Sequence, residues 1–271
     1  MSLSAQRHVV LGSLTNTPPT PVLPSHTIRC KFSSGYTPTM GDTQTLVDAQ
    51  DNVWDIYKAS NDWTILFQNV TDLLEVIAAN TTGVTSMERM FSGCSNLTSV
   101  PLFDTSSCTS MAAMLYECSR LTSLPALNTA SVTNMGAMLY GCSRLTSLPA
   151  LNTANVTNMV NMLNGCSSLV SLPALNTANV TTMRRMLYGC SSLTSLPTLN
   201  TANVTDMALT FNNCTSVQSG ALALYQQAST QATPPPSHSG CFSGCGLNAP
   251  ADAPIHAEML QIPASWGGLG A

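Results

Sequence analysis

The sequence predicts an α/β solenoid, a stack of coils in which every 24 residues contribute one short strand and one short helix. Two observations lead to this prediction: residue types recur at a fixed spacing of 24, and each repeat joins a helix-like apolar pattern to a short apolar run around a proline. Composition agrees, because 44% hydrophobic and only 8% charged residues in 271 favour a folded chain. One coil cannot bury its apolar side alone, so identical residue types must stack in register.

Two columns of residues fix the period. Methionines recur at Met87, Met111, Met135, Met159, Met183 and Met207. Cysteines recur at Cys94, Cys118, Cys142, Cys166, Cys190 and Cys214. A degenerate coil starts near Leu73, and CFSGC at 241–245 is similar to MFSGC at 90–94, which indicates a last partial coil after an insertion.

The two elements of a coil follow from its local pattern. In NVTNMVNMLNGC, residues 155–166, apolar residues at i, i+3, i+6 and i+7 form one face of a helix about two turns long. Asn155 or Thr157 is available as its N-cap, and Gly165 as its left-handed terminator. The next segment is too short and too interrupted by proline for a helix, so residues 170–174 are interpreted as a strand.

The chain divides into four parts. Residues 1–25 form a Thr/Pro-rich N-terminal arm, and residues 26–72 form a strand-rich N-terminal cap, in which Ile28, Cys30 and Phe32 alternate as in a strand. Residues 73–217 form the solenoid. Residues 218–271 form a C-terminal cap that contains the degenerate last coil.

Charge and hydropathy exclude two classes of partner. The net charge is −4, and the 9 Lys and Arg residues are scattered, so no basic stripe is present to attract nucleic acid. No run of 18 apolar residues occurs, so membrane insertion is not expected. The first residues are too interrupted for a secretory signal, so export by such a signal is not expected.

The repeat unit LTSLPALNTANVTNMVNMLNGCS, residues 145–167, resembles the BspA-type leucine-rich repeat, which is found in bacterial surface proteins and in prophage proteins of intestinal bacteria. The resemblance covers about residues 73–217 and rests on its Leu, Pro, Asn-Thr, Val-Thr-Asn-Met and Gly-Cys positions. It implies a leucine-rich-repeat-like, right-handed coil stack. It also implies a role in adhesion and protein recognition, without shared catalytic residues.

The cysteine column is expected to consist of buried reduced thiols, because a free cysteine behaves as a small apolar residue. Disulfide bonds between adjacent coils are an alternative only if the protein resides in an oxidising compartment. His238, Cys241, Cys245 and His256 have the residue types of a zinc site, but their spacing is loose and both cysteines align with repeat positions. Neither a metal nor another cofactor is expected.

An asparagine column follows each expected strand. Its members, with an aspartate in the same column, are Asp104, Asn128, Asn152, Asn176 and Asn200. They can form a ligand-binding ladder, but side-chain bonds that stabilise the local turn are the favoured interpretation.

Positions that vary between repeats are the candidates for specific binding, because the invariant positions are needed for packing. One candidate patch, rich in residue types that interfaces favour, consists of Tyr116, Arg120, Tyr140, Arg144 and Tyr188. A second candidate, on the strand face, consists of Ser99, Ser123, Ser147, Ser171 and Ser195. Ordinary exposed side chains and a solvated sheet are the alternatives for the two sets.

The sequence favours a non-catalytic recognition protein. Rows of like groups do not bring unlike catalytic groups together, and His8, His26, His238 and His256 lie outside the repeats. The expected role is a phage virion component, a fibre, receptor-binding or capsid-decorating protein assembled in the host cytoplasm. Its partners would be a protein or surface glycan of the host cell, or another virion protein. Assembly into a homo-oligomer is a further alternative. A bacterial cell-surface adhesin and an intracellular protein-interaction scaffold are the alternatives.

Overall fold

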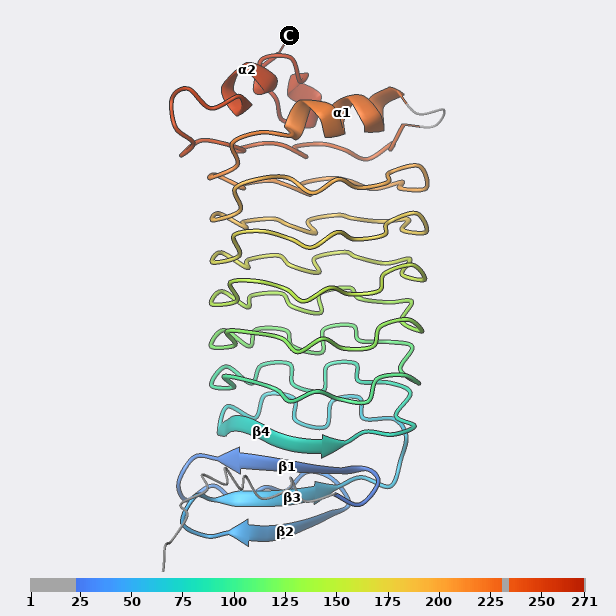
Figure 1. Ribbon diagram of the computed structural model, residues 1–271, viewed down its shortest axis with the longest axis vertical. Coiled ribbons are helices and arrows are strands. Elements are labelled where there is room, and N and C mark those ends of the chain that lie inside the picture. Colours follow the sequence, from blue (N-terminus) through green and yellow to red (C-terminus); the bar gives the residue numbers. More distant parts are fainter. Residues whose placement is uncertain (1–22, 231–233, 271) are drawn as a thin grey trace, which may run out of the picture.

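The computed structural model describes residues 23–230 and 234–270, and the predicted arm at 1–25 therefore lies almost entirely outside the described residues. Figure 1 shows a stack of similar coils with a β-sheet at the N-terminal end and helices at the C-terminal end. The strands are β1 (Thr27–Phe32), β2 (Thr43–Asp48), β3 (Val53–Tyr57) and β4 (Leu73–Asn80). The helices are α1 (Ala221–Thr230), α2 (Ile255–Met259) and the 3-10 helix η1 (Ala264–Trp266).

The N-terminal sheet is antiparallel, with the strand order β2-β3-β1-β4. The alternation noted in the sequence is present, since Ile28, Cys30 and Phe32 of β1 are buried. Arg29 of β1 pairs with Asp55 of β3 at 2.7 Å. Strand β4 lies next to the first coil in Figure 1, so the sheet closes the N-terminal end of the stack.

The prediction of one strand and one helix per coil is wrong. Residues 81–220, all of them described, contain neither a helix nor an extended strand. Adjacent coils are instead joined by isolated parallel bridges that recur every 24 residues as far as Asp206, and a last bridge joins Asp206 to Ser237 after an insertion. The bridged residues are Asp62, Ser86, Ser110, Asn134, Asn158, Thr182, Asp206 and Ser237.

The segment predicted as a helix is a series of tight turns that bonds to the next coil. In one coil the N–H groups of Met135, Ala137, Leu139 and Gly141 donate to carbonyl groups of the following coil at 2.7 to 3.1 Å. The N–H groups of Met138 and Tyr140 donate three residues back within the same coil, to Met135 at 3.2 Å and to Ala137 at 3.1 Å, while the Gly136 N–H donates to Asn134 Oδ1. Some backbone N–H groups therefore stabilise the turn within a coil, and those between them join the coil to the next one.

Backbone conformation explains why no helix forms. A helical residue needs a φ near −63°, whereas Ala137 has a φ of 54° and Gly141 a φ of 71°. The residues at the same position in the other coils also have positive φ: Arg89, Ala113, Asn161, Arg185 and Leu209. The left-handed conformation predicted for Gly165 is present, with φ 77°, but it closes a turn.

The predicted strand at residues 170–174 is also absent. Val170 accepts one backbone bond from Thr194 at 3.2 Å and donates one to Thr146 at 3.3 Å, which joins three coils at a single residue. The proline that follows has no N–H to donate, so the contact does not extend into a ladder.

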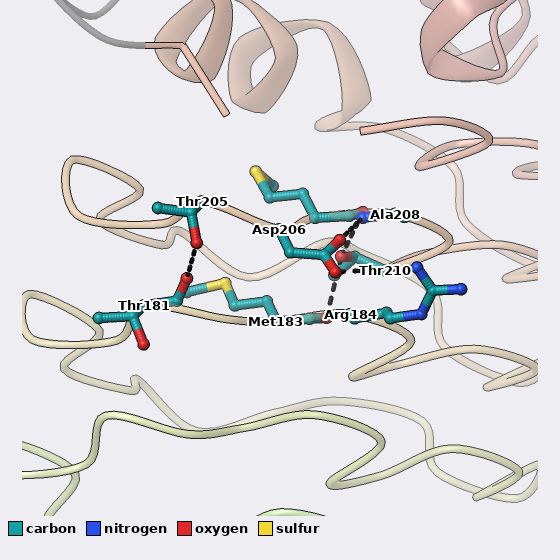
Figure 2. A network of polar contacts seen from close by, with 8 residues as sticks. Thr181, Met183, Arg184, Thr205, Asp206, Ala208 and Thr210 are labelled. Atoms are coloured by element: carbon teal, nitrogen blue, oxygen red, sulfur yellow. Dashed lines mark hydrogen bonds and ion pairs between the residues drawn. The ribbon is translucent and has the colours of Figure 1, made fainter. Parts of the chain in front are cut away.

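Side chains add further bonds between coils. Figure 2 shows Thr205 donating from Oγ1 to the Thr181 carbonyl at 3.0 Å, and Thr210 donating from Oγ1 to the Met183 carbonyl at 3.0 Å. Asp206 accepts the N–H of Ala208 at 2.9 Å and so holds its own turn. A buried threonine column acts in the same way, because Thr153 donates to the Asn176 carbonyl at 2.8 Å.

The cysteine column is reduced, and its thiols are hydrogen-bond donors. All ten cysteines are free and buried. Cys142 donates to the Leu115 carbonyl and Cys166 to the Leu139 carbonyl at 3.2 and 3.1 Å, and the other members of the column do the same. Burial raises the pKa of Cys94 and Cys166 to about 12, so the proton that each bond needs is held tightly.

The ladder extends beyond the segment assigned to the solenoid from sequence. At its start, Trp63 donates to the Ser86 carbonyl at 2.9 Å, so the first turns lie within residues 26–72. At its end, Phe211 donates to the Cys241 carbonyl at 2.8 Å, which brings the CFSGC segment into the stack. Phe242 then donates to the Trp266 carbonyl of η1 at 2.8 Å.

The turn conformation predicts an unusual response to glycine. Changing Ala137 to Gly should leave the melting temperature unchanged or raise it, because an L-residue at positive φ costs about 1 kcal/mol that glycine avoids. In a helix the same change would destabilise by about 1 kcal/mol. The matched control is Ala154→Gly in the next coil, where φ is not positive. This change should lower stability by about 0.5 to 1 kcal/mol. Calorimetric melts showing equal losses for both variants would contradict the turn assignment.

The thiol column predicts alkaline sensitivity. Since the pKa of each thiol is raised from 9.0 on folding, its contribution to stability is complete below about pH 9 and is lost as the pH rises toward about 12. The free energy of unfolding from urea melts should therefore fall steeply between about pH 9 and about pH 11. Thiol titration in denaturant without reductant should find all ten cysteines free. Disulfides between adjacent coils, or stability that is flat across this pH range, would contradict the assignment.

Candidate functional site

Two of the three candidate tyrosines form a stacked pair. The rings of Tyr116 and Tyr140 lie 4.5 Å apart between centroids, with an angle of 8° between their planes. They are half-buried, so the expectation that this column simply faces solvent is only partly met. Burial raises the pKa of Tyr116, and the adjacent carboxylate of Glu117 acts in the same direction.

Tyr188 is separated from this pair by one coil. The coil between them carries Asn164, which is buried and donates from Nδ2 to Asn161 Oδ1 at 3.0 Å. Tyr188 has a different neighbour, because the guanidinium carbon of Arg185 lies 6.0 Å from its ring centroid. The five-residue patch predicted from sequence is therefore two separate groups.

The two candidate arginines are exposed, and each lies four residues after one tyrosine of the pair. Arg120 donates from Nη1 to Asn96 Oδ1 at 3.1 Å, one coil earlier. Neither Arg120 nor Arg144 forms an ion pair within residues 23–230 and 234–270, where the pairs are Arg29 with Asp55, Lys31 with Asp51, and Arg184 with Asp206. We call Tyr116, Arg120, Tyr140 and Arg144 the tyrosine–arginine edge.

The serine column is a second polar row. Ser123, Ser147, Ser171 and Ser195 are exposed, whereas Ser99 is partly buried. None of the five side chains hydrogen-bonds to another residue in the described part of the chain. The row does not lie on a sheet, since no strand forms there, but its hydroxyl groups are free to bind.

The asparagine column is committed to the fold, as the favoured interpretation predicted. Asn152 Oδ1 accepts the N–H of Ala154 at 3.1 Å, and its equivalents in neighbouring coils accept at 3.0 to 3.2 Å. Asn155, interpreted from sequence as a helix cap, instead donates to the Ala130 carbonyl of the preceding coil at 2.8 Å. The cap assignment is wrong because no helix follows it.

The residues with zinc-site chemistry do not converge. His238 stacks on Trp266 with ring centroids 4.2 Å apart, and its Nδ1 lies 2.9 Å from the Pro235 carbonyl oxygen. Cys245 continues the thiol column by donating to the Phe211 carbonyl at 3.1 Å. Over the described ranges no group of three or more His, Cys, Asp or Glu side chains could hold a metal ion.

Two neighbours of the candidate residues were missed from sequence. Asn96 stands in the same column as Arg120, 24 residues earlier, and Arg185 lies three residues before Tyr188. The first spacing is the repeat period itself, so it could have identified the contact. The second contact depends on the positive φ of Arg185, 54°, which nothing in the sequence signals.

No helix among the described residues is long and apolar enough to cross a membrane.

Comparison with known proteins identifies the family. A search of curated proteins found no match for the chain. A solved structure, the crystal structure of a leucine-rich repeat protein from Eubacterium ventriosum ATCC 27560, matches with 19% sequence identity and a TM-score of 0.38. The match covers 70% of this chain and 44% of that chain, so this chain spans less than half the length of that protein. Residues 61–171 and 117–224 match the family described as "Mycoplasma protein of unknown function, DUF285". These overlapping matches extend over more than half of the chain, which therefore belongs to the DUF285 family.

Proposed function

We propose that the chain is a non-catalytic recognition protein that binds a partner protein through the tyrosine–arginine edge. The observation that carries this proposal is the stacked pair of Tyr116 and Tyr140 beside two arginines that have no ion pair in the described chain. Tyrosine and arginine dominate the energetics of protein interfaces. The stacking holds the tyrosines in one arrangement before binding, which lowers the entropy cost of association.

The arrangement of the rings favours a protein over a glycan. A sugar packs against the open face of an aromatic ring, but Tyr116 and Tyr140 cover each other's inner faces. The Tyr188 ring has Arg185 beside it. Ring edges and hydroxyl groups, together with exposed guanidinium groups, suit the mixed polar and apolar surface of another protein.

The regular stack supports a role without catalysis. Successive coils place like groups in rows, such as the serine column and the asparagine column, whereas catalysis needs unlike groups around one pocket. The polar side chains between coils are already engaged with backbone groups, as Thr153 and Asn155 are.

We further propose that the protein acts as a virion component assembled in a bacterial cytoplasm, with the bacterial cell surface as the alternative. Ten reduced, buried cysteines support folding in a reducing compartment. Mass spectrometry of purified phage particles and of cell envelope fractions tests the location. Detection in envelopes alone would favour the surface alternative.

The tyrosine–arginine edge predicts a selective loss of binding. The double variant Tyr116→Ala/Tyr140→Ala should weaken attachment to host cells or to virion proteins by about tenfold or more, because hot-spot tyrosines contribute about 2 kcal/mol. It should also lower stability by about 1 kcal/mol, since stacking is lost. Quantitative pull-down well below the melting temperature separates these two effects.

Two variants serve as controls for this experiment. Tyr188→Ala makes the same chemical change beyond the Asn164 coil and should leave attachment nearly intact. Ser123→Ala/Ser147→Ala/Ser171→Ala alters the exposed serine row and should have little effect on either stability or binding. Loss of attachment in the serine variant, with the tyrosine variant unaffected, would move the site to that row.

A further inference from the structure

Charge is unevenly distributed along the stack. Residues 105–205 contain four arginines and a single carboxylate, Glu117. Residues 23–80, which include the N-terminal sheet, contain seven Asp or Glu and only three Lys or Arg. The chain as a whole carries a net charge of −4, so the positive character of the central coils is local.

Within the central coils, Arg120 and Arg144 lie one above the other. Their backbones are adjacent because Ser143, beside Arg144, donates from Oγ to the carbonyl of Ser119, beside Arg120, at 3.4 Å. Adjacent coils lie about 4.8 Å apart, the spacing of hydrogen-bonded strands. Two exposed arginines thus stand on adjacent coils, and neither forms an ion pair in the described chain.

The fold does not require an arginine at this position, although Arg120 donates a hydrogen bond to Asn96 of the preceding coil. The same column contains Ser168 and Ser192 in the next two coils, which shows that a small polar side chain suffices there. Like charges on neighbouring coils repel one another, so placing two arginines in adjacent coils adds repulsion to the stack. A negatively charged group bound between the two guanidinium groups would remove that repulsion and could accept hydrogen bonds from both.

We propose that the tyrosine–arginine edge binds an acidic segment of its partner protein, with a carboxylate bridging Arg120 and Arg144 across two coils. This inference rests on the proposed function and defines the chemistry of the partner. Each arginine follows one of the stacked tyrosines by four residues, and these tyrosines would receive apolar side chains of the same segment. An acidic polysaccharide would supply carboxylates too, but the stacking of Tyr116 on Tyr140 removes one face of each ring from contact with a sugar.

A direct binding experiment tests the proposal. The probe is a short fluorescein-labelled peptide of alternating Glu and Gly, and its control is the matching Gln and Gly peptide. Binding to the full chain is measured by fluorescence anisotropy at low and high salt. The acidic peptide should bind more tightly than the neutral one, and salt should weaken its binding.

Matched charge variants locate the site. Arg120→Gln/Arg144→Gln and Lys58→Gln/Arg89→Gln each remove two positive charges, but only the first pair lies in the proposed site. We expect affinity to fall about fivefold or more for the first and less than about twofold for the second. Arg120→Lys/Arg144→Lys keeps the charge and should retain most of the affinity. Equal losses in the two Gln variants, or equal binding of both peptides, would overturn the proposal.

The same experiments distinguish a failure of the acidic-segment inference from a failure of the proposed function. If polygalacturonate binds and the acidic peptide does not, the acidic-protein inference is overturned in favour of a glycan. If Tyr116→Ala/Tyr140→Ala abolishes attachment while no acidic peptide binds, the proposed function stands and this inference fails. Unchanged attachment in the tyrosine variant would remove the proposed function itself.

Discussion

The structure depends on backbone hydrogen bonds that run from one coil to the next through the turn segments. Alternate N–H groups, such as those of Ala137 and Leu139, leave their own coil and bond to carbonyl groups of the following one. This geometry requires a residue with positive φ every four positions in the turns. It also stacks each side chain on its equivalent in the next coil, so the columns of cysteine, threonine and tyrosine follow from the same bonds.

Much of the buried interior could be predicted from sequence, and the local backbone could not. The recurrence of Met135 and Cys142 correctly marked buried columns, because packing identical coils requires identical apolar shapes. The same apolar spacing fits a helix, since residues three and four apart share a helical face. Here two consecutive turns produce the same spacing of apolar residues. Ala137 and Arg185 have positive φ, but neither residue type marks that conformation in the sequence as a glycine would.

The sequence predicted which candidate residues occupy equivalent positions in successive coils, but not which of their side chains touch. Periodicity alone placed Tyr116 and Tyr140 in register, and the structure adds that their rings stack. Periodicity also placed Asn164 between this pair and Tyr188, but it did not reveal that Asn164 is buried. The distinction matters physically, because stacking needs direct neighbours, whereas a sequence column continues through a substituted member. The recognition surface is accordingly shorter than the repeat that carries it.

The uniform coils give the molecule an adjustable height. Every coil bonds to its neighbours through the same backbone groups, and no disulfide joins one described coil to another. Duplication or loss of one 24-residue unit would therefore preserve the backbone hydrogen bonds at the junction and change the separation of the sheet from the C-terminal helices by about 4.8 Å. Length is thus set in discrete steps, independently of which side chains a given coil displays, so reach and specificity can evolve separately.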